Sequence, residues 1–406
     1  MQNLKKYITL IALGLAGGVM YVYPYIRYVF HIPLMEALHI NNQEVGLLLT
    51  IYGIVSLFLY IPGGILTDRI RAKKPLLLSM LWAFVLIFGF ALVLTLVTPV
   101  PYWIAIIVWA LMPFATTFVF WNSLVKAIGM AGEDNEQGRC FGIYFAANAI
   151  FGTIISSTNM FAFTQVGFKG VTFSVAGFVL IAILAILFLF KERNLKEVSK
   201  TSFTRAELKQ VLTNKKVWIA GIIMMLIYMM FTCTTYFTPF MTTVCGLNNE
   251  VSGALGVFRT YFIMIFAAIF SGIIADKVFH STLKWFRVAG LCMIASTILF
   301  IITGFNTSPI VVAIVSILPA IFSTMIYAIQ FSTLSELKLP KGVLGTTSGL
   351  ASMIVFSPDI YFDNILGTIL DKNTPDMGYL IIFCLLIAIC IVIVILCTIL
   401  LKINKK

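Results

Sequence analysis

The chain has 406 residues, of which 60% are hydrophobic and only 11% charged, with a formal net charge of +12 and a mean hydropathy of +1.02. Soluble globular proteins carry roughly twice that share of charged residues, because polar groups must cover their surface. The composition therefore excludes a water-soluble enzyme and places most of the chain in lipid. Its seven cysteines lie mainly in apolar runs with no CxxC pair, which predicts neither disulfides nor a zinc site.

Twelve apolar runs are long enough to cross a membrane, because about 20 helical residues span the roughly 30 Å hydrocarbon layer. We expect these helices at about 7–30, 44–66, 76–98, 102–126, 140–163, 171–190, 217–240, 252–275, 285–305, 309–333, 344–369 and 378–401. The first run is too long for a signal peptide and is followed by no small-residue cleavage site, so we interpret it as a retained span. The predicted fold class is an all-α integral membrane protein with twelve transmembrane helices.

The distribution of Lys and Arg predicts the orientation of these helices. If the N-terminus is cytoplasmic, the inner segments hold 24 of the 28 basic residues, whereas the outer loops hold only Lys169 and Lys372. Arg27 and Arg259 lie within spans. We therefore expect both termini inside the cell, and the basic balance then follows from the inner loops and does not indicate binding to nucleic acid.

The longest polar stretch, residues 191–216, divides the chain into two six-helix bundles, residues 1–190 and 217–406. Thr204 to Glu207 fits a capping box, so this linker is either a short interfacial helix or an irregular charged segment. The halves resemble each other: Asn41-Asn42 returns as Asn248-Asn249, and Gly64-Ile-Leu-Thr-Asp68-Arg69 returns as Gly272-Ile-Ile-Ala-Asp276-Lys277. Repeated six-helix bundles with a site between them are a transporter architecture.

The segment Gly64-x-Leu66-x-Asp68-Arg69, followed by Lys73 and Lys74, resembles the signature of the loop between helices 2 and 3 of the major facilitator superfamily. Arg71 and Ala72 stand where the family has glycine and arginine. The resemblance covers the whole chain and implies two pseudo-repeated bundles that expose a central site alternately to each side.

Two further stretches resemble a branch that includes sugar-phosphate and nitrate/nitrite permeases. They are Phe120-Trp121-x-x-Leu124-Val125-Lys126 with Gln137-Gly138-Arg139-x-Phe141-Gly142, and Pro358-Asp359-Ile360 followed by Gly367 and Asp371. This narrower resemblance does not identify a substrate.

The superfamily resemblance implies a cytoplasmic gate in which Asp68 is held by a helix N-terminus and a basic side chain, an arrangement that the helix dipole favours. Gly345-Thr346-Thr347 supplies the candidate helix start and Lys126 the candidate cation. An ordinary charged loop is the alternative. We predict gating roles for Gly64, Asp68, Arg69, Lys126, Arg139 and Asp276.

Arg27 and Arg259 are candidate substrate residues, because charges inside a membrane usually face a cavity or a partner. Arg259 lies about 10 Å below the predicted outer surface. Arg27 is close enough to that surface to extend toward it instead. A guanidinium group suits a carboxylate or phosphate better than a neutral solute, so we expect a small anion as substrate.

Asp359 and Asp363 are four residues apart in the eleventh predicted span, which would place them on one helix face. Two carboxylates in a low dielectric do not both stay ionised, so one is expected to take up protons readily. We predict either a proton-coupling acid or a static ion pair with Arg259. Tyr23, on the face of Arg27, and the amides Asn148 and Gln330 are further candidate binding residues, although such amides also bond between helices.

No nucleotide-binding or hydrolase motif is found, so the energy source is expected to be a gradient and no cofactor or metal is predicted. The sequence predicts a multi-pass secondary transporter of the cell (inner or plasma) membrane, for a small organic or phosphorylated anion, acting as a proton symporter or an anion antiporter. Its expected partners are membrane lipid, the substrate and a coupling proton or counter-anion, and we expect a monomer. Proton-coupled efflux of hydrophobic or cationic drugs is the main alternative, followed by a membrane enzyme, a receptor or a channel.

Overall fold

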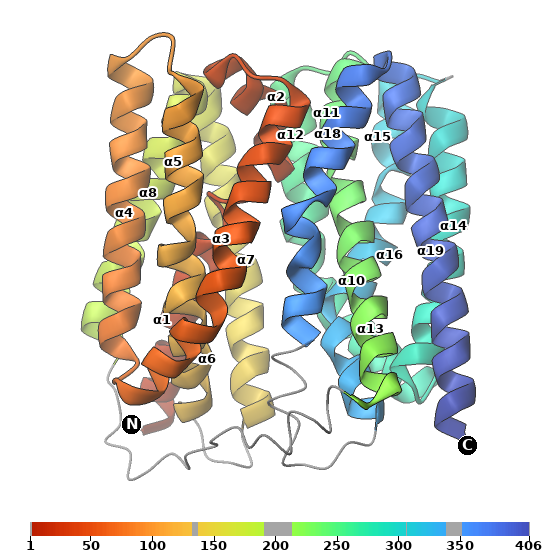
Figure 1. Ribbon diagram of the computed structural model, residues 1–406, viewed down its shortest axis with the longest axis horizontal. Coiled ribbons are helices and arrows are strands. Elements are labelled where there is room, and N and C mark those ends of the chain that lie inside the picture. Colours follow the sequence, from red (N-terminus) through yellow and green to blue (C-terminus); the bar gives the residue numbers. More distant parts are fainter. Residues whose placement is uncertain (1, 132–136, 191–212, 306, 338–350, 406) are drawn as a thin grey trace. The chain divides into compact units, whose positions relative to one another are not determined.

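The computed structural model describes residues 2–131, 137–190, 213–305, 307–337 and 351–405, which form helices joined by short turns (Figure 1). The chain divides into two compact units. Unit 1 comprises Met1–Lys196 and Asn249–Phe262, and unit 2 comprises Glu197–Asn248 and Ile263–Lys406. The division into bundles 1–190 and 217–406 concerns the sequence repeats and stays a prediction.

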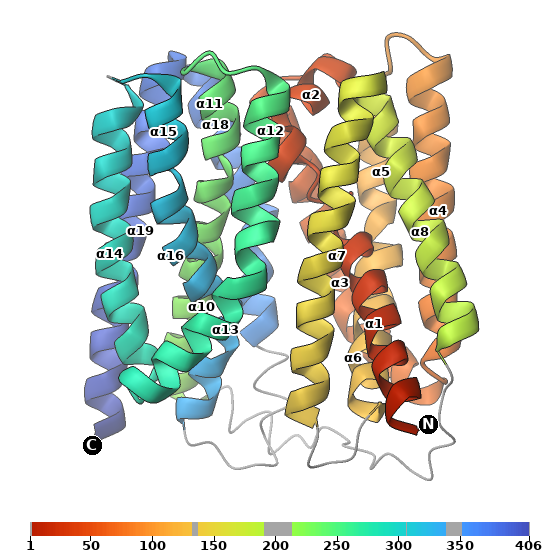
Figure 2. The ribbon, with the colours of Figure 1, turned by 180° about the vertical axis from the view of Figure 1, so that it is seen from behind.

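Unit 1 contains the helices α1 (Gln2–Met20), α2 (Arg27–Leu38), α3 (Asn42–Arg69), α4 (Lys73–Leu96), α5 (Tyr102–Pro113), the π-helical η1 (Phe114–Phe118), α6 (Phe120–Met130), α7 (Gln137–Val166), α8 (Phe168–Leu189), α12 (Asn249–Val257) and the π-helical η3 (Phe258–Phe262). Helix α1 packs against α7 and α8 (Figure 2). Gly14, Gly17 and Gly18 face α7, and a side chain at any of them would meet Ala147, Tyr144 or Asn148. These small residues allow the two backbones to approach closely.

Unit 2 contains α10 (Lys215–Thr235), α11 (Phe237–Thr243), α13 (Ile263–Ile273), the π-helical η4 (Ile274–Val278), α14 (Thr282–Gly304), α15 (Pro309–Val315), α16 (Ile317–Ala328), the 3₁₀-helical η5 (Gln330–Leu337) and η7 (Ser357–Ile360), α18 (Phe362–Lys372) and α19 (Pro375–Lys405). Helix α19 packs along α14 and α10. Phe237, Phe240, Phe300 and Phe383 form a buried aromatic cluster between α11, α14 and α19.

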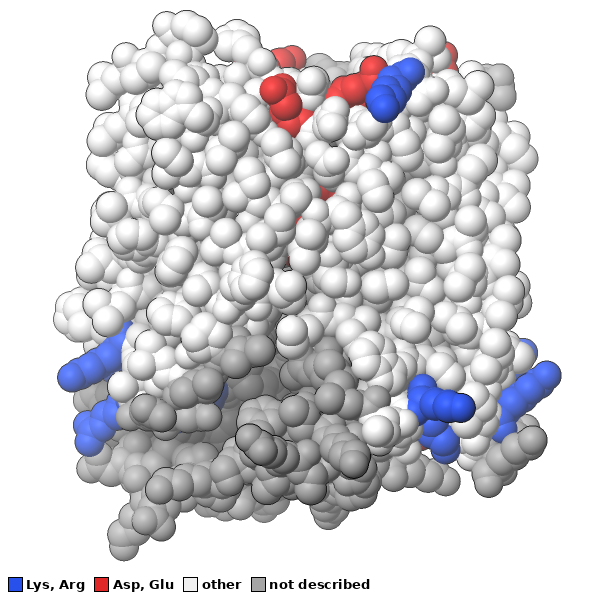
Figure 3. Space-filling model, in the orientation of Figure 1, with Lys and Arg blue, Asp and Glu red and all other residues white. Residues whose placement is uncertain are grey.

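Ten helices of the described part of the chain are long and apolar enough to cross a membrane, and Lys6–Met20 is a shorter apolar helix. Helix α7 covers the fifth predicted span without being among the ten. Large apolar side chains such as Phe58, Leu78 and Phe188 are exposed on the outside of the helices, as expected where lipid is the solvent. The face shown in Figure 3 has a mostly uncharged middle, with several basic side chains near one end of the helices and acidic side chains, together with a basic one, near the other.

Proline divides several predicted spans into two helices. Because a proline lacks an N–H group and its ring clashes with the carbonyl four residues earlier, a helix ends or kinks there. Helices α1, α10 and α15 end at Met20, Thr235 and Val315, each four residues before Pro24, Pro239 and Pro319. The first predicted span is accordingly not one helix over 7–30 but two helices, α1 and α2, separated by the turn 21–26.

The π-helical segment η1 is held by hydroxyl groups of the turn 21–26 and of α3. Tyr21 donates to the carbonyl oxygen of Thr116 at 3.1 Å, and the hydroxyls of Tyr52 and Thr116 are 2.9 Å apart. Gly63 of α3 lies so close to the carbonyl of Phe118 that a Cβ atom would collide with that backbone. π-Helical turns widen the helix and disturb its regular hydrogen bonds, and these contacts stabilise the segment.

Candidate substrate and coupling sites

Three elements of unit 1, α2, α7 and α12, meet at one place, which we call the α2–α7–α12 seam. The rings of Phe30 and Phe163 connect α2 to α7, with centroids 5.8 Å apart. A side chain at Gly253 of α12 would meet Met160 of α7 and Val29 of α2. The seam is therefore a direct contact of three helices.

Both arginines that lie within predicted spans are buried, one on α2 and the other on η3, which continues α12 and packs against α7. Arg27, the first residue of α2, is 3% exposed, and its guanidinium lies 4.8 Å from the ring centroid of Tyr28. Protein thus encloses a side chain that could have reached toward the membrane surface. Arg259 lies in η3 and is 4% exposed. In the same π-helical turn, Tyr261 packs against Gly152 and is hydrogen-bonded to Ser156, both of α7.

The other two predicted binding residues of unit 1 are engaged within it. Tyr23 is 0% exposed, its hydroxyl is 3.3 Å from the Oγ1 of Thr172, and its ring packs against Phe90 and Trp109. Tyr23 is thus part of the core of unit 1. The amide of Asn148 donates to the Tyr144 hydroxyl at 3.3 Å, beside the contact of α7 with α1.

In unit 2, each aspartate of the eleventh predicted span accepts a hydrogen bond from a tyrosine. Tyr228 lies in α10, and Tyr236 directly follows that helix. The Tyr228 hydroxyl donates to Asp359 Oδ1 at 2.5 Å, and the Tyr236 hydroxyl donates to Asp363 Oδ1 at 3.4 Å. The carboxylates are 5% and 2% exposed, respectively. A buried carboxylate needs such donors because its desolvation is costly.

The expectation that these aspartates share one continuous helix is wrong. Asp359 lies in the 3₁₀-helical η7 and Asp363 in α18, and the backbone of Tyr361 between them is not helical (φ −137°, ψ −29°). Pro358 lies in the first turn of η7, where a missing N–H group is tolerated. Both carboxylates nevertheless bond to the seventh predicted span.

Aromatic rings surround the first of these carboxylates. The Tyr228 ring lies 5.3 Å from Phe356 and 6.3 Å from Tyr327, which stacks on Phe231. Gln330, at the start of η5, is 3% exposed, and its Oε1 has no hydrogen-bond partner among the described residues.

Of the predicted gating residues, Lys126 has the clearest role. Its Nζ donates to the carbonyl oxygens of Thr67 at 2.9 Å and Ile70 at 3.0 Å, at the C-terminal end of α3. A cation at this position neutralises the negative end of the helix dipole. The predicted partner helix start, Gly345–Thr347, lies outside the described residues.

The remaining gating residues lie at helix ends. The backbones of Gly64, Asp68 and Arg69 are in the last turns of α3, and Arg139 is in the first turn of α7; the side chains of these four lie outside the described part of the structure. Asp276 is exposed in η4.

Two further charged side chains form hydrogen bonds to helix termini, a role that was not predicted from the sequence for either of them. Lys73 donates to the carbonyl oxygens of Leu187 at 2.8 Å and Phe190 at 2.7 Å, at the end of α8. Glu336 accepts from the backbone N–H groups of Thr282 and Leu283 at the start of α14, and from the Ser281 hydroxyl. A charged residue in a short loop next to a predicted helix terminus is the signal that would have suggested both.

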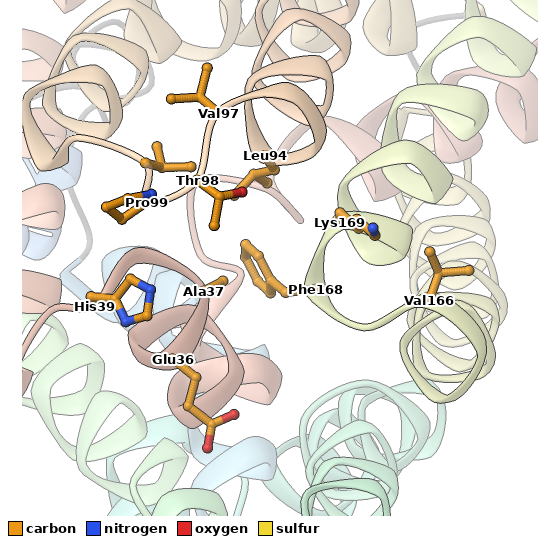
Figure 4. Close-up of a pocket in the computed structure, with 11 residues that line it drawn as sticks. Glu36, Ala37, His39, Leu94, Val97, Thr98, Pro99, Val166, Phe168 and Lys169 are labelled. Carbon is orange, nitrogen blue, oxygen red and sulfur yellow. The ribbon is translucent and has the colours of Figure 1, made fainter.

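A pocket of about 270 Å³ lies at the surface of unit 1 (Figure 4). Its lining includes Glu36, His39, Phe168 and Lys169, from the end of α2 and the start of α8. None of the predicted site residues lines it, so it does not bear on the sites above.

Comparison with known proteins gives the family. The family model of the Major Facilitator Superfamily matches residues 8–359. The chain belongs to this superfamily. It is 26% identical over 400 residues to the inner membrane protein YihN of Escherichia coli K12, covering 94% of this chain and 92% of that one. It is 24% identical over 384 residues to the inner membrane protein YqcE of the same organism, covering 90% and 88%.

Solved structures of transporters share the fold. A point mutant of the nucleoside transporter NupG superimposes with a TM-score of 0.71 at 15% identity, covering 98% of this chain and 100% of that one. A bacterial homologue of the lysosomal transporter Spinster, in an inward-facing and unoccupied conformation, gives 0.76 at 12% identity, covering 99% and 97%. The chain is therefore a multi-pass cell membrane protein of a transporter family, as the sequence predicted.

Proposed function

We propose that this protein carries a small organic or phosphorylated anion across the cell membrane by alternating access, through proton symport or exchange for another anion. The observation that carries this proposal is the burial of Arg27 on α2 and of Arg259 on η3, the π-helical turn that continues α12. Two buried guanidinium groups in a membrane-embedded bundle are costly, and a carboxylate or phosphate is the ligand whose geometry matches them.

Asp359 and Asp363 are the proposed proton-coupling groups. Each is buried and accepts a tyrosine hydroxyl, so proton uptake would change the hydrogen bonding between the seventh and eleventh predicted spans. Because transport requires two conformations that differ in such contacts, a carboxylate here couples protonation to the change of state. Further proposed contributors are Tyr23, Asn148 and Gln330 to substrate binding and, at the cytoplasmic gate, Gly64, Asp68, Arg69, Lys126, Arg139 and Asp276.

A second candidate function is proton-coupled efflux of hydrophobic or cationic compounds. The aromatic surroundings of Asp359 favour it, because a carboxylate beside tyrosine and phenylalanine rings also suits an organic cation.

The deciding experiment is thermal stabilisation of the purified protein by a panel of phosphorylated sugars, mono- and dicarboxylates, inorganic anions, neutral sugars and cationic drugs. A ligand at about 100 times its Kd stabilises the fold by about 2.7 kcal/mol. We expect anions alone to raise the melting temperature, and Arg259→Gln to abolish that response. A response to cationic compounds alone, retained in Arg259→Gln, would replace anion transport by drug efflux.

A further inference from the structure

Two neutral polar side chains of α7 and α12, each next to a residue that contacts the other helix, are buried without a hydrogen-bond partner among the described residues. Asn159 of α7 is 0% exposed, and both its amide nitrogen and its amide oxygen are unpaired in this sense. Ser252 of α12 is 1% exposed, and the same holds for its hydroxyl. Buried polar groups are nearly always hydrogen-bonded, so each exception requires an explanation.

These two side chains occupy neighbouring levels of facing helices. Met160 contacts Gly253, and these two residues directly follow Asn159 and Ser252 in the sequence. This contact defines the register of the two helices at one point. Tyr261 contacts Gly152 further along. The two contacts show that α7 and the α12–η3 segment run antiparallel.

This register also places the unpaired amide relative to the buried arginine. Interpolation between the two contacts puts Arg259 level with residue 154 of α7, five residues from Asn159. At 1.5 Å per residue, the two levels are about 7 Å apart along the helix. The seam therefore presents a cationic level and a neutral polar level in sequence.

We propose that Asn159 and Ser252 form a subsite that binds a hydroxyl group of the transported anion, whose charged group binds at Arg259. This inference rests on the proposed function and narrows its substrate class to hydroxylated anions. An asparagine amide both donates and accepts, as does a serine hydroxyl. A hydroxyl ligand satisfies both roles, whereas a carboxylate accepts only and would leave the Asn159 oxygen unpaired.

The separation of the levels suits a substrate with several carbons between its charge and its hydroxyl. An anion with hydroxyl groups along a chain or ring, such as a sugar phosphate or sugar acid, meets this requirement. A small inorganic anion reaches only the arginine level.

The test compares matched pairs of probes that differ in their hydroxyl groups: glycerol 3-phosphate with n-propyl phosphate, and gluconate with hexanoate. Apparent Kd values come from thermal shifts of the purified protein. We expect the hydroxylated member of at least one pair to bind about tenfold more tightly to the wild type. Asn159→Leu should lower the affinity for the hydroxylated probe to that of the probe without hydroxyl groups, whose own affinity should not change. Ser252→Ala should remove part of the preference for the hydroxylated probe.

Thr297→Val is the matched control. Thr297 of α14 is also fully buried, its hydroxyl has no partner in the described part of the chain, and it lies in unit 2. The substitution should leave both Kd values unchanged. If Asn159→Leu raises the melting temperature without ligand and keeps the hydroxyl preference, the amide is only an unpaired polar group and the subsite is refuted.

The other outcomes separate the two proposals. Equal affinity for both members of each pair in the wild type refutes the subsite, while loss of that affinity in Arg259→Gln upholds anion transport. No response of the wild type to any anion, with a response to cationic drugs, refutes both.

Discussion

The two units bury charges of opposite sign. The buried charged side chains of the described residues are Arg27 and Arg259 in unit 1 and Asp359 and Asp363 in unit 2. A charge inside a membrane protein is retained where it has a task, because its desolvation is costly. This difference supports the proposed roles, in which the buried arginines bind an anion and the buried aspartates take up a proton.

A similar contrast is found for three charged side chains at helix ends. In unit 1, Lys73 and Lys126 donate to carbonyl groups at helix C-termini, whereas in unit 2 Glu336 accepts from N–H groups at the start of α14. Both arrangements compensate a helix dipole, from its negative and its positive end respectively. These three charged side chains thus hold helix ends of opposite polarity.

The largest effect is expected from removing Arg259, one of the two buried arginines of unit 1. Arg259→Gln should lower kcat/KM for anion uptake into proteoliposomes about 100-fold, since charge-assisted hydrogen bonds contribute about 3 kcal/mol. Arg259→Lys should retain only part of the wild-type kcat/KM, because an ammonium group lacks the planar arrangement of donors of a guanidinium group. Arg287→Gln, at an exposed position of α14, is the control. Equal uptake by Arg259→Gln and Arg287→Gln would make the buried arginine structural.

The acids of unit 2 can be tested separately. Asp359→Asn should abolish anion accumulation driven by a pH gradient and preserve exchange of anion for anion, because the amide cannot take up the proton. Tyr228→Phe should reduce gradient-driven accumulation several-fold, since it removes only the donor to Asp359. Asp376→Asn, which changes an exposed carboxylate, should have no effect. Accumulation that persists in Asp359→Asn would leave unit 2 without its assigned role.

Glycine substitutions compare how helices approach within each unit. A side chain at Gly63 meets the backbone carbonyl of Phe118 in unit 1, whereas one at Gly290 meets the Cγ2 atom of Val394 in unit 2 at 2.9 Å. Because a backbone cannot turn aside, Gly63→Ala should destabilise by about 3 kcal/mol and Gly290→Ala by about 1 kcal/mol. Thermal unfolding in detergent measures both, and the reverse order would contradict this reading of the contacts.

The smallest effects concern the helix ends. Lys126→Gln and Glu336→Gln should each cost about 1 kcal/mol, because each removes a charge from a helix terminus and leaves a side chain that still forms hydrogen bonds. Hydrogen exchange should rise at Thr282 and Leu283 only in Glu336→Gln. Faster exchange at Thr282 and Leu283 in Lys126→Gln would show that the contacts of Lys126 and Glu336 with helix termini are not independent.

Much of the fold follows from the sequence. Hydrophobic length located the ten helices of the described part that are able to cross a membrane, whereas the count of twelve and the inner position of both termini stay predictions. The positions of Pro24 and Pro239 account for the breaks at Met20 and Thr235 through local sterics. The π-helical turn at Arg259 could not be predicted, because its residues are compatible with an ordinary helix and only packing selects the wider turn.

The candidate sites were predicted less completely. The rarity of charge inside a span drew attention to Arg259 and Asp359, but no sequence pattern pairs Tyr228 with a carboxylate 131 positions away. The sequence did not identify Asn159 as a binding residue, because an asparagine in a long apolar helix can equally well form a hydrogen bond within the protein. Only the burial of both its polar atoms distinguishes it.

The break at Thr235 gives the seventh predicted span a mechanical property. A continuous helix tilts as one body, whereas a helix with a break can tilt on one side of the break alone. Tyr236 lies at this joint, between α10 and α11, and its hydroxyl reaches Asp363. Any bending of α11 against α10 therefore stretches or relaxes the hydrogen bond to one buried carboxylate.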